Sequence, residues 1–135
     1  MALIHRVAFI NRIKSIGFAF KGALHLLKKE ASIQVQFVIG ILLTIAGFYF
    51  ELSTTEWIIQ VLVIGLIMSI EGINSAIEEI ADFIHPDYHK KIGLIKDISA
   101  GAVFIFALAA IIIGFIIYIP KTNCVKPTKN KHKVM

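Results

Sequence analysis

The chain has 135 residues, of which 57% are hydrophobic and 17% are charged, and its formal net charge is +5. With a mean hydropathy of +0.79 it is too apolar for an ordinary soluble domain, so the composition indicates an integral membrane protein with room for three spans. The basic residues lie mostly at the two ends and flank apolar segments, a pattern that fits anionic lipid headgroups better than nucleic acid. We therefore expect an all-α membrane protein that does not bind nucleic acid.

Residues 3–29 alternate apolar and basic positions at helical spacing. This pattern predicts an amphipathic helix that lies in the membrane interface. The alternative, an amphipathic helix in the core of a soluble bundle, is disfavoured by the apolar segments that follow it.

Three membrane spans are predicted next, at about 33–50, 57–84 and 98–119. At about 1.5 Å per residue the first is just long enough to cross the hydrocarbon core of a bilayer. The second is expected to project beyond the bilayer and to end at His85-Pro86, since the residue before a proline disfavours helix. The third should stop at Pro120. Residues 1–120 would then form one domain, and the lysine-rich segment 121–135 a disordered tail.

Basic residues predict the orientation of these spans. Six precede the first span and none lies in the turn 51–56, which places the N-terminus and the region 71–97 in the cytoplasm. The five lysines of the tail would then emerge on the outer side, against the rule. We give more weight to the N-terminal residues, because the first helix usually sets the topology.

The second predicted span carries an acidic segment at its end. From Trp57 to Ile70 there is no formal charge, and Glu71 then follows without a break in helical character. At about 100° per residue, five polar residues fall within roughly 100° of one another on one helix face. Carboxylates at bilayer depth are energetically costly and mark functional sites. The five are Glu71, Asn74, Ser75, Glu78 and Asp82.

Three antiparallel spans would bring these acids, Glu30 and the pair Lys96-Asp97 to one level of the membrane. Carboxylates from two helices are suited to Mg²⁺, which binds one or two carboxylates together with substrate phosphates. A nearby lysine would neutralise phosphate oxygens, and a remaining acid could accept a proton from an alcohol. This set of groups is typical of phosphoryl transfer. The motifs of soluble kinases are absent: Gly17 and Gly22 have P-loop spacing, but no Lys-Ser/Thr follows them.

The segment Glu71-x-Ile-Asn-Ser-Ala-Ile-Glu78-x-x-Ala-Asp82 resembles the signature of the small prokaryotic diacylglycerol kinases, which include the undecaprenol kinases. The resemblance covers about residues 12–119 and extends to Lys21-Gly22, Glu30, 87–89 and Lys96-Asp97. It implies a homotrimeric bacterial inner-membrane enzyme with active sites shared between subunits. The enzyme would transfer the γ-phosphate of ATP-Mg²⁺ to the primary hydroxyl of a lipid, either diacylglycerol or undecaprenol.

The resemblance also implies roles for particular residues. Glu71 would be the general base, with Asn74 supporting it, and Glu30 and Glu78 would ligate the Mg²⁺ that accompanies ATP. Further nucleotide contacts would come from Arg12, Asp87, Tyr88, His89, Lys96 and Asp97.

Three positions depart from the family pattern. Ala81 stands where the signature usually has valine, and Phe18 where some members have a tyrosine that contacts the nucleotide. Ungapped counting places the N-terminal arginine of the family on Asn11, adjacent to Arg12, so which of the two acts is open. Asp82 is equally open between a nucleotide contact and a solvated face.

Two other functions are compatible with some of these residues. A small carboxylate-lined cation transporter is the alternative, because carboxylates within membranes also mark ion paths. It is disfavoured because the middle of each span is apolar and the acids gather at one face of the bilayer. A zinc site at His85 and His89 is disfavoured because Pro86 breaks the helix between them and no cysteine or third histidine is close.

Overall fold

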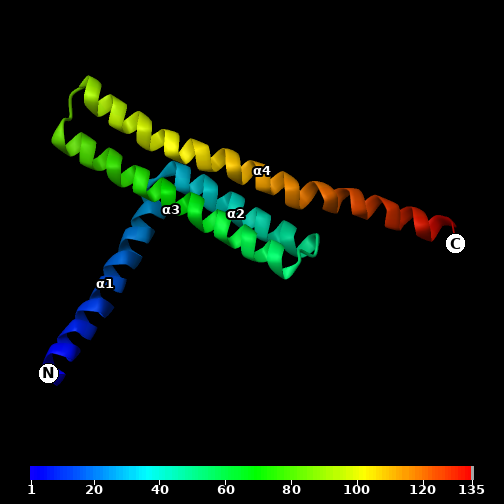
Figure 1. Ribbon diagram of the computed structural model, residues 1–135, viewed down its shortest axis with the longest axis horizontal. Coiled ribbons are helices and arrows are strands. Elements are labelled where there is room, and N and C mark those ends of the chain that lie inside the picture. Colours follow the sequence, from blue (N-terminus) through cyan, green and yellow to red (C-terminus); the bar gives the residue numbers. More distant parts are fainter. Residues whose placement is uncertain (135) are drawn as a thin grey trace.

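The computed structural model describes the backbone of residues 1–134 and the side chains of residues 1–123. It contains the helices α1 (Ala2–Lys29), α2 (Ala31–Tyr49), α3 (Thr54–Ile84) and α4 (Lys90–Val134). Figure 1 shows α2, α3 and α4 side by side, with α1 leaving the bundle at a steep angle. Helices α2, α3 and α4 are each long and apolar enough to cross a membrane, which confirms the predicted all-α fold with three spans.

One extended residue separates α1 from α2. Glu30 has φ −98° and ψ 111°, and it ends α1 and begins α2. Its N–H donates to the carbonyl of Leu26, and its carbonyl accepts from the N–H of Gln34, both at 3.0 Å. No residue of α1 is buried. The helix predicted for 3–29 is therefore present, whereas its position in the membrane interface stays a prediction.

The turn between α2 and α3 is closed by hydrogen bonds at both helix ends. Glu51 adopts the left-handed conformation (φ 53°), so that the N–H of Leu52 reaches the carbonyl of Gly47 at 3.1 Å. Ser53 and Glu56 then form a reciprocal capping box at the start of α3. Glu56 also pairs with Lys121 of α4 at 3.0 Å, and this hydrogen bond lowers the pKa of Glu56.

A polar network ties α2, α3 and α4 together near the same end of the bundle. The amide of Gln60, which is only 5% exposed, donates to the carbonyl of Leu43 at 3.1 Å. The hydroxyl of Tyr118 is bonded to the side-chain oxygen of Gln60 and lies 3.2 Å from the same carbonyl. Both the nitrogen and the oxygen of the buried Gln60 amide therefore have hydrogen-bond partners, as is usual for buried polar groups.

The predicted end of α3 is confirmed, whereas α4 is longer than the predicted third span, whose bounds in the membrane stay a prediction. Helix α3 ends at Ile84, followed by an extended His85 before Pro86. Helix α4 begins at Lys90, well before the predicted start at 98, and continues through Pro120 rather than stopping there. A proline inside a helix removes one N–H donor but can be accommodated at the cost of that bond. The backbone of the predicted disordered tail is thus helical to Val134; its side chains from residue 124 lie outside the described residues.

Candidate active site

The acidic segment lies on the last four turns of α3, beyond the level at which α2 begins. The side chain of Leu26 lies 3.0 Å from where a Cβ on Gly72 would be, so the end of α1 packs against α3 beside Glu71. Helix α3 and the start of α4 then extend past this junction (Figure 1). The structure therefore places Glu30, at the junction of α1 and α2, close to the level of the acidic face.

The five polar residues of this face differ in burial. Asn74 and Ser75 are buried, Glu71 and Glu78 are half-buried, and Asp82 is exposed. The hydroxyl of Ser75 donates to the carbonyl of Glu71 at 3.1 Å, so the hydroxyl proton of Ser75 is bonded within α3. The gradient places Glu71 in more apolar surroundings than Asp82.

Asn74 carries an unpaired buried oxygen. The residue is 7% exposed, and its Oδ1 has no hydrogen-bond partner among the described residues. An unsatisfied buried carbonyl oxygen costs about 1–3 kcal/mol, and such groups require an explanation. Asn74 lies between Glu71 and Glu78 along the predicted catalytic face, where a bound ligand or metal could supply the partner.

Asp82 is paired with the start of α4. Lys96 Nζ donates to Asp82 Oδ1 at 2.5 Å, and this hydrogen bond raises the pKa of Lys96. Both groups lie outside the predicted bilayer core. The bridge joins α3 to α4 and brings two of the charged positions that carry the resemblance into direct contact.

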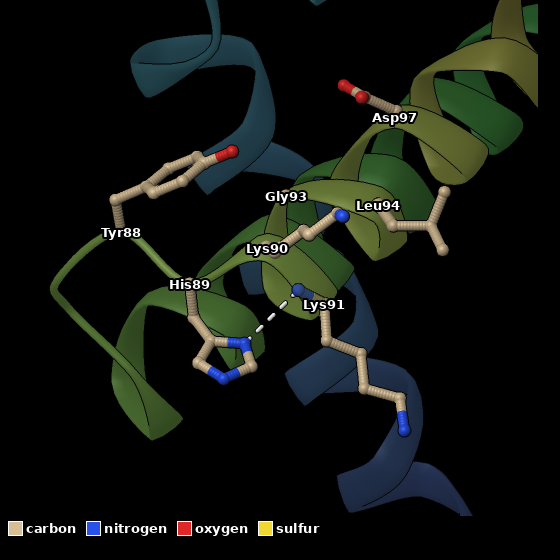
Figure 2. A pocket seen from close by; sticks show the side chains of 7 residues that line it. All are labelled: Tyr88, His89, Lys90, Lys91, Gly93, Leu94 and Asp97. Carbon is tan, nitrogen blue, oxygen red and sulfur yellow. Dashed lines mark hydrogen bonds between the residues drawn. The ribbon is translucent and has the colours of Figure 1, made fainter.

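The loop and the first turns of α4 surround a cavity of about 680 Å³. Three of the predicted nucleotide contacts line it, namely Tyr88, His89 and Asp97. Asp87 and Lys96 are not among the lining residues. The cavity is completed by Lys90, Lys91, Gly93 and Leu94, which sequence reasoning did not select (Figure 2).

The two histidines of the loop have separate hydrogen-bond partners. His85 Nδ1 lies 2.6 Å from the carbonyl of Asp87, which requires a proton on that nitrogen. His89 Nδ1 instead accepts from the N–H of Lys91 at 3.1 Å and so caps α4. Their rings are 5.2 Å apart. Because these nitrogens are already engaged, the pair is better suited to shaping the loop than to binding zinc.

Glu30, Glu78 and Arg12 are not joined to one another by an ion pair or a side-chain hydrogen bond among the described residues. Within the described side chains, no three His, Cys, Asp or Glu residues lie close enough to hold a metal ion. Arg12 is exposed on α1, which projects from the bundle (Figure 1). The proposed meeting of Glu30 with Glu78, and of Arg12 with the nucleotide, therefore remains a prediction.

Comparison with known proteins places this arrangement in a family. Residues 17–118 match the model of the prokaryotic diacylglycerol kinases. The chain belongs to this family. It is accordingly a membrane lipid kinase, as the acidic signature of α3 indicated.

Several characterised members are similar to the chain over most of its length. Undecaprenol kinase of Bacillus subtilis (strain 168) is 37% identical over 117 residues, covering 87% of this chain and 95% of that protein. Diacylglycerol kinase of Escherichia coli (strain K12) is 29% identical over 104 residues, covering 77% and 85%. Diacylglycerol kinase of a Synechocystis species is 26% identical over 111 residues, covering 82% and 63%.

Proposed function

We propose that the protein transfers the γ-phosphate of ATP to the primary hydroxyl of a membrane lipid, in a Mg²⁺-dependent reaction, and that undecaprenol is the preferred acceptor. The observation that carries the proposal is the acidic face of α3. It holds half-buried carboxylates and a buried, unpaired Asn74 oxygen at the end of an uncharged span. Such a face meets a lipid headgroup on one side and a soluble nucleotide on the other.

Glu71 is the proposed general base. It is the acid nearest the uncharged stretch 57–70, so it lies at the depth where a lipid hydroxyl would be found. It takes the proton of that hydroxyl as the oxygen attacks the γ-phosphorus, and ADP leaves. Asn74, one turn away on the same face, positions Glu71.

The donor groups fit a magnesium ion. Glu78 and Glu30 supply carboxylate oxygens, the ligand type that Mg²⁺ prefers alongside substrate phosphates. When bound, the ion would neutralise charge on the phosphate oxygens. The chain contributes the carboxylates that hold it, and Asp87, Tyr88, His89, Lys96, Asp97 and Arg12 are the proposed nucleotide contacts.

A homotrimer with shared sites is proposed for the assembly. Helix α1 buries none of its residues in the single chain, although it carries large apolar side chains. Among the described residues of one chain, no three His, Cys, Asp or Glu side chains lie close enough to hold a metal ion. Both observations support sites completed by a neighbouring copy, in a bacterial inner membrane with the N-terminus and the acidic face cytoplasmic.

The preference for undecaprenol rests on the comparison with relatives, and an apolar groove supports a site for the hydrocarbon chain of either acceptor. The undecaprenol kinase relative is more similar to the chain, and matches it over more of its length, than the diacylglycerol kinase of Escherichia coli. An apolar groove of about 500 Å³ runs between α2 and α3 and includes Met68, one turn before Glu71. A hydrocarbon chain in this groove would bring its hydroxyl toward the proposed base.

The test is an assay of purified protein with radiolabelled ATP and Mg²⁺, with undecaprenol and diacylglycerol supplied separately in mixed micelles. We expect phosphate transfer to both, with the higher kcat/KM for undecaprenol. Higher kcat/KM for diacylglycerol would overturn the acceptor preference alone. No transfer to either lipid would overturn the proposed reaction. A cation transporter has no support from the family, and the middles of the spans remain apolar.

A further inference from the structure

The first two turns of α4 carry cavity-lining residues to which the sequence assigned no role. Lys90, Gly93, Leu94 and Asp97 follow the spacing i, i+3, i+4 and i+7, which places them on one side of the helix. All four line the cavity of about 680 Å³. Tyr88 forms one side of it, with the edge of its ring 3.5 Å from where a Cβ on Gly93 would be. The cavity therefore offers an aromatic ring, a carboxylate and an ammonium group.

The two lysines of the first turn point in different directions. Figure 2 shows Lys90 directed toward the side of the helix on which Tyr88 and Asp97 lie, and Lys91 directed away from them. Consecutive residues of a helix are about 100° apart, which accounts for the divergence. The backbone N–H of Lys91 donates to His89 in the cap, whereas its ammonium group extends to the opposite side. Lys90 is thus the lysine that faces Tyr88 and Asp97.

Lys96, the lysine among the proposed nucleotide contacts, is not the cation of this cavity. Lys96 is bonded to Asp82 of α3 and does not line the cavity. No acidic residue lies in the first turn of α4, where the helix dipole disfavours cations. The ammonium group of Lys90 therefore has no acidic partner in the first turn of α4, which leaves it available to a ligand.

The position of Lys90 along the bundle, relative to Glu71 and Glu78, indicates which part of ATP it can reach. Helices α3 and α4 are antiparallel, and Lys96 is level with Asp82 through their bridge. Lys90 lies six residues before Lys96, roughly 9 Å farther from Glu71 and Glu78 along the axis. With the γ-phosphate held at those two carboxylates, the end of ATP nearest Lys90 is the nucleoside.

We propose that Lys90 is a further substrate-binding residue that contacts the nucleoside of ATP, an inference that rests on the proposed kinase function. Its ammonium group donates to ring nitrogens of the base or to ribose oxygens. Asp97 accepts from ribose hydroxyls or the exocyclic amine, and the exposed ring of Tyr88 provides a stacking surface. The expected contacts in this cavity are Tyr88, His89 and Asp97, none of which is a lysine or an arginine. Lys90 adds a positively charged donor to them.

The test compares Lys90→Gln with Lys91→Gln, an adjacent substitution with the same change in charge. We expect Lys90→Gln to raise the KM for ATP about three- to tenfold at unchanged kcat, as loss of one hydrogen bond predicts. Lys91 also lines the cavity, but its ammonium group is directed away from Tyr88 and Asp97, so Lys91→Gln should raise the KM less than about twofold. Binding of a fluorescent ATP analogue should follow the same order. An unchanged KM in Lys90→Gln, or an equal rise in Lys91→Gln, overturns the assignment.

A second measurement separates nucleoside from phosphate contacts. Inorganic tripolyphosphate lacks a nucleoside, so its inhibition constant should be the same for the wild type and Lys90→Gln. Weaker inhibition of the variant would place Lys90 at the phosphates and overturn the proposal. Wild-type turnover in the same assay reports separately on the kinase function. A wild type that neither turns over nor binds the analogue overturns both.

Discussion

Lys96 and Asp82 join α4 to α3 at the outer edge of the acidic face, with Nζ and Oδ1 2.5 Å apart and side chains 35% and 60% exposed. Because exposed ion pairs are worth about 0–1 kcal/mol, Asp82→Asn should lower the free energy of unfolding by less than about 1 kcal/mol. The measurement is a double-mutant cycle with Lys96→Met, using thermal denaturation in detergent. A coupling energy well above this range would show that the bridge is part of a larger network.

The same bridge predicts how stability depends on pH. The hydrogen bond raises the pKa of Lys96 above its ordinary value of 10.5, so its stabilising effect is complete below that pH and is lost only as pH rises through the higher folded value. The thermal stability difference between wild type and Lys96→Met should therefore be constant from about pH 6 to 9. A difference that shrinks in this range would contradict the assigned partner.

Glu71→Gln should abolish turnover without preventing nucleotide binding. The amide keeps the size of the side chain but cannot accept a proton from the lipid hydroxyl, and general-base catalysis is typically worth about 10²–10⁴-fold. Turnover with radiolabelled ATP and binding of a fluorescent ATP analogue measure the two properties separately. A variant with the wild-type rate would remove Glu71 from the mechanism.

Glu78→Gln should act on the metal rather than on proton transfer. Loss of one carboxylate ligand is expected to raise the Mg²⁺ concentration needed for half-maximal activity. Glu79→Gln is the matched control, because this neighbouring acid is exposed and about 100° away around the helix. Similar Mg²⁺ dependence in the two variants would count against a ligand role for Glu78.

Much of the fold followed from local signals in the sequence. The apolar lengths predicted the three spans, and Pro86 predicted the end of α3 at Ile84. Pro120 misled the same reasoning, because a proline inside a helix costs a hydrogen bond without always ending the helix. A proline therefore makes the end of a helix more frequent at that position, but whether the helix ends there depends on the residues around it.

The site was predictable where it lies on one helix and less so where two helices meet. The spacing from Glu71 to Asp82 placed those residues on one face of α3. The bridge from Asp82 to Lys96 depends on the register of α3 against α4, which no local pattern specifies. Lys90 did carry a signal, since it lies seven residues before Asp97 and so on the same face of a helix.

Tyr118→Phe should destabilise the protein and spare catalysis. The change removes the hydroxyl bonded to Gln60 and leaves a buried amide oxygen without that partner, at a cost of about 1–3 kcal/mol. Tyr49→Phe is the control, because Tyr49 is 76% exposed. Thermal denaturation in detergent should show a lower midpoint for Tyr118→Phe alone. A large fall in kcat at a temperature where the variant is folded would contradict a purely structural role.

Gly65→Leu tests the apolar groove between α2 and α3 as the place of the acceptor chain. A Cβ at Gly65 meets nothing within 4 Å, so a larger side chain can enter the groove without disturbing the helix contacts. The variant should raise the KM for undecaprenol several-fold and leave the KM for ATP unchanged. Gly101→Leu is the control: position 101 of α4 is equally open but does not line the groove. Equal effects of the two substitutions on the lipid KM would indicate that the acceptor chain lies elsewhere.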